Sequence, residues 1–458
     1  MLSIQLIREN PDLVRRALQR RHTEAPLDEA LALDARWRSV LAEVESLRAE
    51  RNALSKEIGG LSRLAKGAGL PTGQAGTKEA KHAEHRRSDL MARSSFAGER
   101  LDALEDALKE LDGQLRRVLL EIPNIPADDV PDGADESGNV VVRQSGEPAA
   151  PGFQSKPHWE LGESLGIIDF ERGAKLAGSR FYVLMGAGAR LERALIAWML
   201  DFHTARGYRE VYPPAMIKEE ALWAGGWLPK FADNMYHDAE EDYWWIPTAE
   251  VALTNMHRDE ILEPGSLPIS YVAGTPCFRR EKMSAGRDVR GIKRVHQFHK
   301  VEMYKFVEPE QSEQALADMV AQAEALAGEL GIARRVVELC GGDLGFNAAR
   351  AFDIELWAPG CGEWLEVSTC SNCTDFQARR ANIRFRREKG TRPEHPHTLN
   401  GSGLGLPRTM IAVLENYQQA DGSVLVPDVL RPYMGGMERI VSGAGEGRQQ
   451  VDQTSPEM

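Results

Sequence analysis

Two stretches that alternate like β-strands flank a short basic loop, and this arrangement suits the binding of a polyanion. The first ends in Phe278-Arg279-Arg280-Glu281 and the second runs from Arg294 to Glu302, with a loop holding Gly286, Arg287, Asp288, Arg290 and Gly291. The pattern predicts a hairpin. Arginine suits a phosphate group because its planar fork stays charged and donates two hydrogen bonds at once. A solvated surface hairpin is the alternative for this segment taken alone.

A second candidate phosphate site lies far along the chain. The run Asn400-Gly401-Ser402-Gly403-Leu404 precedes Arg408 and an apolar series with helical spacing, Met410, Val413, Leu414 and Tyr417. We expect a Gly-rich turn that enters a helix, because glycine lets the backbone approach a ligand closely. Arg408 then falls in the first turn of this helix.

Two further blocks accompany these. They are Pro247-Thr248-Ala249-Glu250 and a run from Glu366 through Val367, Ser368 and Thr369 to Arg380 that contains Cys370 and Cys373. Taken together and in this order, the four blocks resemble the class II aminoacyl-tRNA synthetases, and specifically the seryl-tRNA synthetases. The resemblance extends from the first residues to about residue 440.

The resemblance implies an ATP-dependent ligase that activates L-serine as seryl-adenylate and transfers it to the 3′ end of tRNA(Ser), and by family analogy to tRNA(Sec). It implies that Arg279 bridges the α-phosphate and the serine carboxylate, that Glu281 reads the adenine amino group, and that Arg408 meets the γ-phosphate. Glu366 and Thr369 match positions that hold Mg²⁺. The remaining ATP-binding positions are Arg280, Val295, Val367 and Ser368.

The resemblance also implies a small pocket for serine. Thr248 and Glu250 correspond to residues that recognise the amino group, and Glu302 to one that recognises the hydroxyl or amino group. Ser402 completes the pocket, and Ala249 is a further serine-binding position. A buried polar group that pairs with the substrate hydroxyl rejects analogues without it by roughly 10⁴ to 10⁵.

Residues 1–120 contain two apolar series that alternate in steps of three and four. One runs from Leu33 to Leu61 and the other from Leu90 to Val118, and Gly67, Gly69, Pro71, Gly73 and Gly76 separate them. The spacing predicts two antiparallel helices that form a coiled coil. A dimerisation device is the plain alternative. Between residues 48 and 100, however, 11 Lys and Arg face 6 Asp and Glu, which favours an RNA backbone as partner.

The remaining chain predicts an α+β body. We expect a Pro- and Gly-rich linker over 121–155, a class II catalytic domain over 156–445 and a polar tail over 446–458. Mixed helical and strand-like runs favour a largely antiparallel sheet with flanking helices. Helical stripes run from Leu191 to Phe202 and from Leu316 to Leu330, and a strand covers 352–356. The family resemblance adds a homodimer, formed around residues 191–214.

From the composition we expect a soluble cytoplasmic protein. The net charge is −13, and the sequence holds neither an 18-residue apolar stretch nor an apolar signal core at its amino terminus. The five cysteines are few and odd in number, which argues for reduced thiols. A zinc site built on Cys370 and Cys373 fits the usual paired spacing poorly.

Two rival functions remain at this stage. The first is a synthetase-like ligase that charges a non-tRNA acceptor such as a carrier protein, which the basic arm disfavours. The second is a catalytically silent RNA-binding relative, which the intact Arg279, Glu302 and Arg408 disfavour.

Overall fold

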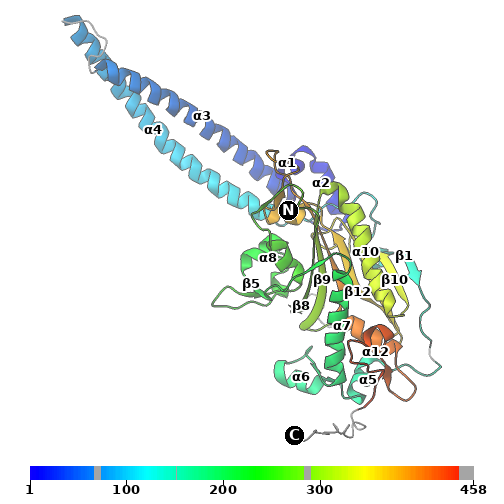
Figure 1. Ribbon diagram of the computed structural model, residues 1–458. Coiled ribbons are helices and arrows are strands. Elements are labelled where there is room, and N and C mark those ends of the chain that lie inside the picture. Colours follow the sequence, from blue (N-terminus) through cyan, green and yellow to red (C-terminus); the bar gives the residue numbers. More distant parts are fainter. Residues whose placement is uncertain (66–73, 151, 283–289, 443–458) are drawn as a thin grey trace, which may run out of the picture. The chain divides into compact units, whose positions relative to one another are not determined.

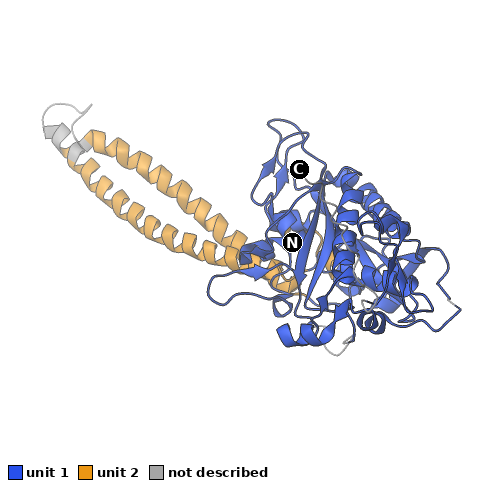
Figure 2. Ribbon diagram, turned by 60° about the horizontal axis from the view of Figure 1, so that its bottom comes forward, with its two compact units in different colours: residues 1–2, 16–24, 123–458 blue, residues 3–15, 25–122 orange. Residues whose placement is uncertain are grey.

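The computed structural model describes residues 1–65, 74–150, 152–282 and 290–442. The predicted breaker residues Gly67, Gly69, Pro71 and Gly73, the loop residues Gly286, Arg287 and Asp288, and the tail 446–458 therefore lie outside the described residues. The chain divides into two compact units (Figure 2). One contains residues 1–2, 16–24 and 123–458, and the other contains residues 3–15 and 25–122.

The smaller unit is a long helical hairpin. Helices α3 (Leu27–Ala65) and α4 (Gln74–Leu119) run antiparallel (Figure 1). They follow the short helices α1 (Ile4–Glu9) and α2 (Pro11–Arg20), and the second half of α2 belongs to the larger unit. The predicted apolar series supply the buried seam, including Leu33, Val44, Leu101 and Leu115. Both helices are longer than the series that predicted them, and Gly76 lies inside α4 rather than in a break.

Several arginines of this hairpin form ion pairs with glutamates. Arg86 pairs with Glu57 at 2.6 Å and Arg93 pairs with Glu50 at 3.2 Å, each across the two helices. These exposed pairs each contribute little stability. The arginines nevertheless have a role inside the hairpin, so Lys78 and Lys81, which are exposed, carry more of the argument for an RNA partner.

The larger unit is built on an eight-stranded sheet, ordered β1-β10-β11-β12-β14-β9-β8-β4, in which every pair is antiparallel except β4 with β8. The α+β prediction is confirmed. The sheet strands are β1 (Val140–Ser145), β4 (Arg209–Glu210), β8 (Ile269–Phe278), β9 (Gln297–Val307), β10 (Arg334–Glu338), β11 (Arg350–Ala358), β12 (Glu363–Asn372) and β14 (His397–Gly405).

Helices cover both faces of this sheet. The larger core lies between the sheet and helices α7, α10 and α12, and a second core lies beside α9 and α11. The helices of this unit are α5 (His158–Ser164), α6 (Phe170–Ala177), α7 (Ala187–Thr204), α8 (Glu219–Gly225), α9 (Ala249–Asn255), α10 (Ser312–Glu329), α11 (Phe376–Arg380) and α12 (Leu406–Asn416). The short strands are β2 (Ile168–Asp169), β3 (Val183–Leu184), β5 (Met216–Ile217), β6 (Trp244–Trp245), β7 (Ile261–Leu262), β13 (Arg384–Phe385), β15 (Val424–Leu425) and β16 (Arg439–Ile440).

Two expected boundaries differ from the structure. The segment 121–155, predicted to be a linker, contributes β1, which pairs with β10 at the edge of the sheet. Residues 16–24 belong to the larger unit although they lie within the predicted arm. Arg21 anchors this segment: its buried guanidinium donates to the carbonyls of Asn124, Leu344 and Ala348. Among the described residues, no helix is long and apolar enough to span a bilayer.

Candidate active site

A cleft of about 520 Å³ opens on the sheet face opposite the larger core. Side chains alternate along a strand, so Val301 and Met303 of β9 enter the core while Lys300 and Glu302 face the cleft. The cleft is lined by Trp227, Phe231, Asn234, Thr248, Glu250, Arg279, Glu281, Lys293, Arg294, Val295, Phe298, Lys300, Glu302, Gly345, Glu366, Val367, Thr369, Asn400, Ser402, Gly405, Pro407 and Arg408.

All predicted site residues line the cleft except Ala249, Arg280 and Ser368. Ala249 is fully buried in the first turn of α9 and packs in the second core. Ser368 turns away from the cleft, and its hydroxyl donates to the carbonyl oxygen of Ser402 at 2.6 Å. Arg280 follows Arg279 in the chain, and its backbone N–H donates to the carbonyl of Asn234.

The predicted Gly-rich turn at residues 400–404 is wrong, because these residues belong to strand β14. Gly401 and Gly403 have a packing role: a Cβ at Gly401 would meet the Met319 and Cys370 sulfurs at 2.8 Å, and one at Gly403 would meet His203 Nε2 at 2.4 Å. The predicted helix is confirmed as α12, with Arg408 in its first turn.

A β-bulge brings Glu366 and Thr369 to the same side of β12. Glu355 of β11 pairs with Glu366, whereas the preceding Ile354 pairs with Ser368, so Val367 is an extra residue. The extra residue reverses the alternation of side chains. Residues three apart therefore meet, and the Thr369 hydroxyl donates to Glu366 Oε1 at 3.3 Å.

One part of the cleft is acidic. Lys300 Nζ lies 2.5 Å from Glu302 Oε2, and Glu250 accepts hydrogen bonds from Gln377 at 2.5 Å and from Asn400 at 3.3 Å. Burial and the neighbouring Glu302 carboxylate raise the pKa of Glu250 to about 7. Two carboxylates beside one lysine leave this part of the cleft with excess negative charge, which suits a compact ammonium group.

A second part of the cleft gathers cations. Arg279 lies over the Phe298 ring, 5.3 Å from its centroid, and Arg408 contacts Glu366 Oε2 at 3.1 Å. Burial opposes ionisation of Glu366, but Arg408 outweighs it and lowers the pKa of this carboxyl. Glu281 Oε2 lies 3.9 Å from Arg294. Fixed positive charges beside an aromatic ring suit a nucleotide with its phosphates.

The donors around Glu366 fit a hard divalent cation. Glu366 and Thr369 offer a carboxylate and a hydroxyl, and Asp353, the cross-strand partner of Thr369, shares their face of the sheet. Asp353 Oδ1 is buried without a hydrogen-bond partner among the described residues. Burial, followed by the charge of Glu366, raises the pKa of Asp353 well above its usual value. Such oxygen-only sets are typical of Mg²⁺ sites.

The sequence reasoning missed several cleft residues. Lys300 had a usable signal, because it precedes Glu302 by two positions on one strand and must share its face. Trp227 and Phe231 follow α8 and gave no signal, since nothing in their spacing joins them to the other blocks. Lys293 and Arg294 lie just before β9, where the basic loop returns to the sheet.

Two family models match parts of this chain. The model of the tRNA synthetase class II core domain (G, H, P, S and T) matches residues 231–417, and that of the seryl-tRNA synthetase N-terminal domain matches residues 1–69. A serine--tRNA ligase of Thermomicrobium roseum is 59% identical over 96% of this chain and 95% of its own length. The chain belongs to the seryl-tRNA synthetase family.

Solved structures of this synthetase family extend the likeness. The enzyme of Pyrococcus horikoshii, complexed with ATP, is 40% identical with a TM-score of 0.87, over 96% of this chain and 100% of that one. The cytoplasmic enzyme of Naegleria fowleri, in complex with AMP, is 31% identical with a TM-score of 0.82, over 97% and 99%. This synthetase is therefore a class II enzyme, a serine--tRNA ligase, and its class II core match contains every predicted site residue.

Proposed function

We propose that the cleft joins L-serine to ATP as seryl-adenylate and then esterifies the 3′ end of tRNA(Ser), and of tRNA(Sec) where the organism has one. The observation that carries the proposal is a cleft lined by both an acidic and a cationic group of side chains. Glu250, Glu302 and Ser402 belong to the first group, and Arg279 and Arg408 belong to the second. The solved relative that binds ATP supports the assignment of the cationic group.

Activation needs orientation and charge neutralisation more than a general base. The serine carboxylate is already ionised at pH 7, and its oxygen attacks the α-phosphorus while the bond to the bridging oxygen of pyrophosphate breaks. Arg279 neutralises the α-phosphate and the attacking carboxylate, and Arg408 meets the γ-phosphate. In the second step the terminal tRNA hydroxyl attacks the carbonyl carbon, and AMP leaves.

Glu281, Arg280, Val295, Val367 and Ser368 complete the ATP site in this proposal. Glu281 accepts from the adenine amino group, and Val295 and Val367 contact the nucleotide. Ser368 acts indirectly, because it fixes the carbonyl of Ser402, and Arg280 acts from outside the cleft lining.

Glu366 and Thr369 would hold Mg²⁺, with Asp353 as the further oxygen donor beside them. A bound Mg²⁺ would neutralise charge on the phosphate oxygens of ATP. Glu366 also contacts Arg408 at 3.1 Å, so the carboxylate that would hold the cation lies beside the arginine that would meet the phosphates.

Serine is selected by its size and its hydroxyl. Thr248, Ala249 and Glu250 form the wall that receives the ammonium group, with Ala249 acting through its buried position in α9. Glu302 Oε2 is buried and accepts no hydrogen bond of good geometry within the described chain, although Lys300 lies beside it. A serine hydroxyl would donate a hydrogen bond to this carboxylate, whereas alanine offers it no donor.

The helical hairpin α3–α4 is the proposed tRNA contact. Its exposed Lys78 and Lys81 suit phosphate binding, and the match to the seryl-tRNA synthetase N-terminal domain supports the assignment. We also propose a homodimer, with Tyr212, which is 89% exposed, in the subunit contact. The enzyme would act in the cytoplasm, where tRNA is charged.

Pyrophosphate exchange, measured with each amino acid and with and without tRNA, tests the proposal. We expect exchange with serine and charging of tRNA(Ser). Exchange with threonine or glycine in place of serine would overturn the specificity. Exchange with serine but no charging of tRNA would favour a ligase that uses a non-tRNA acceptor.

A further inference from the structure

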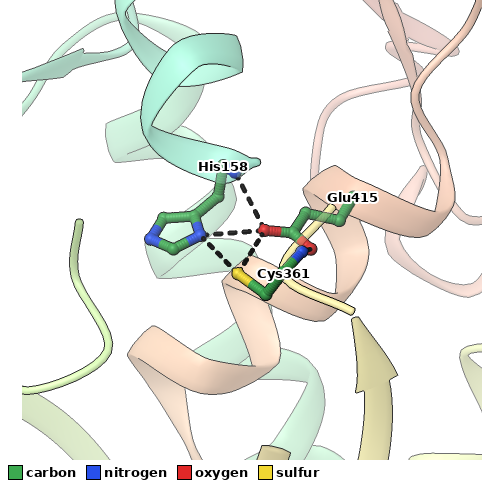
Figure 3. A group of neighbouring side chains, drawn as sticks. All are labelled: His158, Cys361 and Glu415. Atoms are coloured by element: carbon green, nitrogen blue, oxygen red, sulfur yellow. Dashed lines mark hydrogen bonds and ion pairs between the residues drawn. The ribbon is translucent and has the colours of Figure 1, made fainter. Parts of the chain in front are cut away.

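A buried cluster outside the cleft joins three distant segments of the larger unit. His158 begins α5, Cys361 lies in the turn between β11 and β12, and Glu415 lies in the last turn of α12. Figure 3 shows the three side chains pointing toward one another, and their candidate ligand atoms lie within 4.8 Å of one another. None of the three lines the cleft.

Glu415 organises this cluster as a hydrogen-bond acceptor. Its Oε1 accepts from the backbone N–H of His158 at 2.9 Å and lies 2.9 Å from His158 Nδ1, and the Cys361 thiol donates to it at 3.1 Å. Its Oε2 accepts from the backbone N–H groups of Gly360 at 2.8 Å and Cys361 at 2.9 Å. Burial opposes ionisation, but these bonds outweigh it and lower the pKa of Glu415.

The far side of the His158 ring fixes its tautomer. Nε2 accepts the backbone N–H of Ile292 at 3.1 Å, so the ring proton lies on Nδ1 and is donated to Glu415. The same three side chains could ligate a transition metal, but a metal on Nδ1 would place a proton on Nε2. That proton would face the Ile292 N–H group. The cluster is therefore a hydrogen-bonded relay rather than a metal site.

The contact between His158 and the backbone at residues 291 and 292 is so close that position 291 must be glycine. Gly291 has a φ of +77°, and a Cβ at this position would lie 2.1 Å from His158 Nε2. The backbone of residues 291 and 292 thus lies directly against the imidazole. The next two residues, Lys293 and Arg294, line the cleft.

A second connection links Glu415 to the side chain of Lys293, whereas the first reaches the backbone of Lys293 through Ile292. Lys293 Nζ lies 2.6 Å from Glu363 Oε2, and Glu363 follows Cys361, whose N–H group is bonded to Glu415, by two residues. A closed ring of contacts therefore runs from Glu415 through His158 to Lys293 and returns through Glu363. The other end of α12 carries Arg408, so one helix links both sets of cations.

We propose that His158 is a positioning residue that, through Ile292, holds Lys293 and Arg294 where they meet the triphosphate opposite Arg408. The inference rests on the proposed function, because it assumes that the cationic part of the cleft binds ATP. A loop displaced by about 1 Å would weaken a charged contact without changing the acidic part of the cleft.

Two substitutions separate the two bonds of His158. In His158→Asn the amide reaches the position of Nδ1 and keeps the Glu415 bond but not the Ile292 bond. In His158→Gln the amide reaches the position of Nε2 and can accept from Ile292. We expect His158→Asn to raise KM for ATP about tenfold in serine-dependent pyrophosphate exchange, with kcat and KM for serine within about twofold. His158→Gln should recover most of this loss.

Lys293→Ala tests whether His158 acts through the loop. It should raise KM for ATP by a similar factor. The double variant His158→Asn with Lys293→Ala should have a KM for ATP no higher than that of the more impaired single variant, because the effects of coupled residues are not additive. His257→Asn is the matched control, since His257 also bonds a glutamate, Glu260, at 2.8 Å and lies outside the cleft lining. Its KM for ATP should not change.

Three results would overturn the inference. They are an unchanged KM for ATP in His158→Asn, fully additive losses in the double variant, and a stoichiometric zinc ion in the purified protein that Cys361→Ser removes. Calorimetric titration of ATP in the same variants keeps the inference separate from the proposed function. If wild-type protein fails to exchange pyrophosphate with serine, the proposed function fails, whereas weaker ATP binding in His158→Asn would still support the role of His158.

Discussion

Binding of serine should release a proton near neutral pH, because Glu250 must ionise to receive the ammonium group. Burial and Glu302 raise the pKa of Glu250 to about 7. An ammonium ion bound beside it favours the charged form, so the pKa falls in the complex and the proton leaves. At pH 7 about half of the free enzyme carries this proton, so about 0.5 proton should be released for each serine bound.

The same pKa sets the pH dependence of serine affinity. The ionised fraction of Glu250 falls from about nine-tenths at pH 8 to about one-tenth at pH 6. We therefore expect KM for serine to rise about tenfold over this range, equivalent to about 1.4 kcal/mol of binding free energy. KM for ATP, measured in the same pyrophosphate-exchange assays, should change far less, because Glu250 belongs to the acidic part of the cleft.

Isothermal titration calorimetry in two buffers with different ionisation enthalpies measures the released proton directly. Glu250→Gln removes the titrating group while keeping its shape, so it should bind serine weakly at every pH and release no proton. Serine binding by wild-type protein that releases no proton at pH 7, together with a flat KM between pH 6 and 8, would refute the reasoning.

Three further predictions concern other parts of the chain. Arg408→Ala should abolish adenylate formation in pyrophosphate exchange while filter binding of tRNA(Ser) changes little, and loss of both together would contradict the separation of roles. Deleting residues 33–118 should do the reverse, and charging at an unchanged rate would refute our account of the arm. Burial lowers the pKa of His203 to about 4 in the folded protein. As the pH falls below about 6.5, His203 is therefore protonated in the unfolded chain while it is still neutral in the folded one. Wild-type protein should therefore lose about 2 kcal/mol more unfolding free energy between pH 7 and pH 5 than His203→Gln, as measured by urea denaturation, and equal losses would argue against a neutral buried His203.

Helices and strands whose side chains follow a regular local spacing were predictable from the sequence. The heptad spacing gave the pair α3 and α4, and alternation on either side of the basic loop gave the hairpin β8–β9. Most site residues followed from the family resemblance, because each belongs to a short block whose order could be recognised. The helix α12, with Arg408 in its first turn, was instead predicted from the apolar spacing of Met410, Val413, Leu414 and Tyr417.

Features that depend on packing between distant segments were not predictable. Gly401 and Gly403 looked like a phosphate-binding turn, and only their contacts with Met319 and His203 show why glycine is required in a strand. The bulge at Val367 depends on pairing with β11. The strand β1 inside the expected linker likewise depends on β10, which lies almost two hundred residues away.

Arg21 has a consequence for how the polypeptide is made. Its guanidinium bonds the carbonyl of Leu344, which lies 323 residues further along the chain. The ribosome therefore synthesises this arginine long before its hydrogen-bond acceptors. Residues 16–24 cannot reach their final position until most of the chain has been translated. Arg21 has no carboxylate partner among the described residues, so its burial is favourable only once those carbonyls surround it. We expect the amino-terminal segment to be the last part of the larger unit to settle, and the one most dependent on protection as the nascent chain emerges.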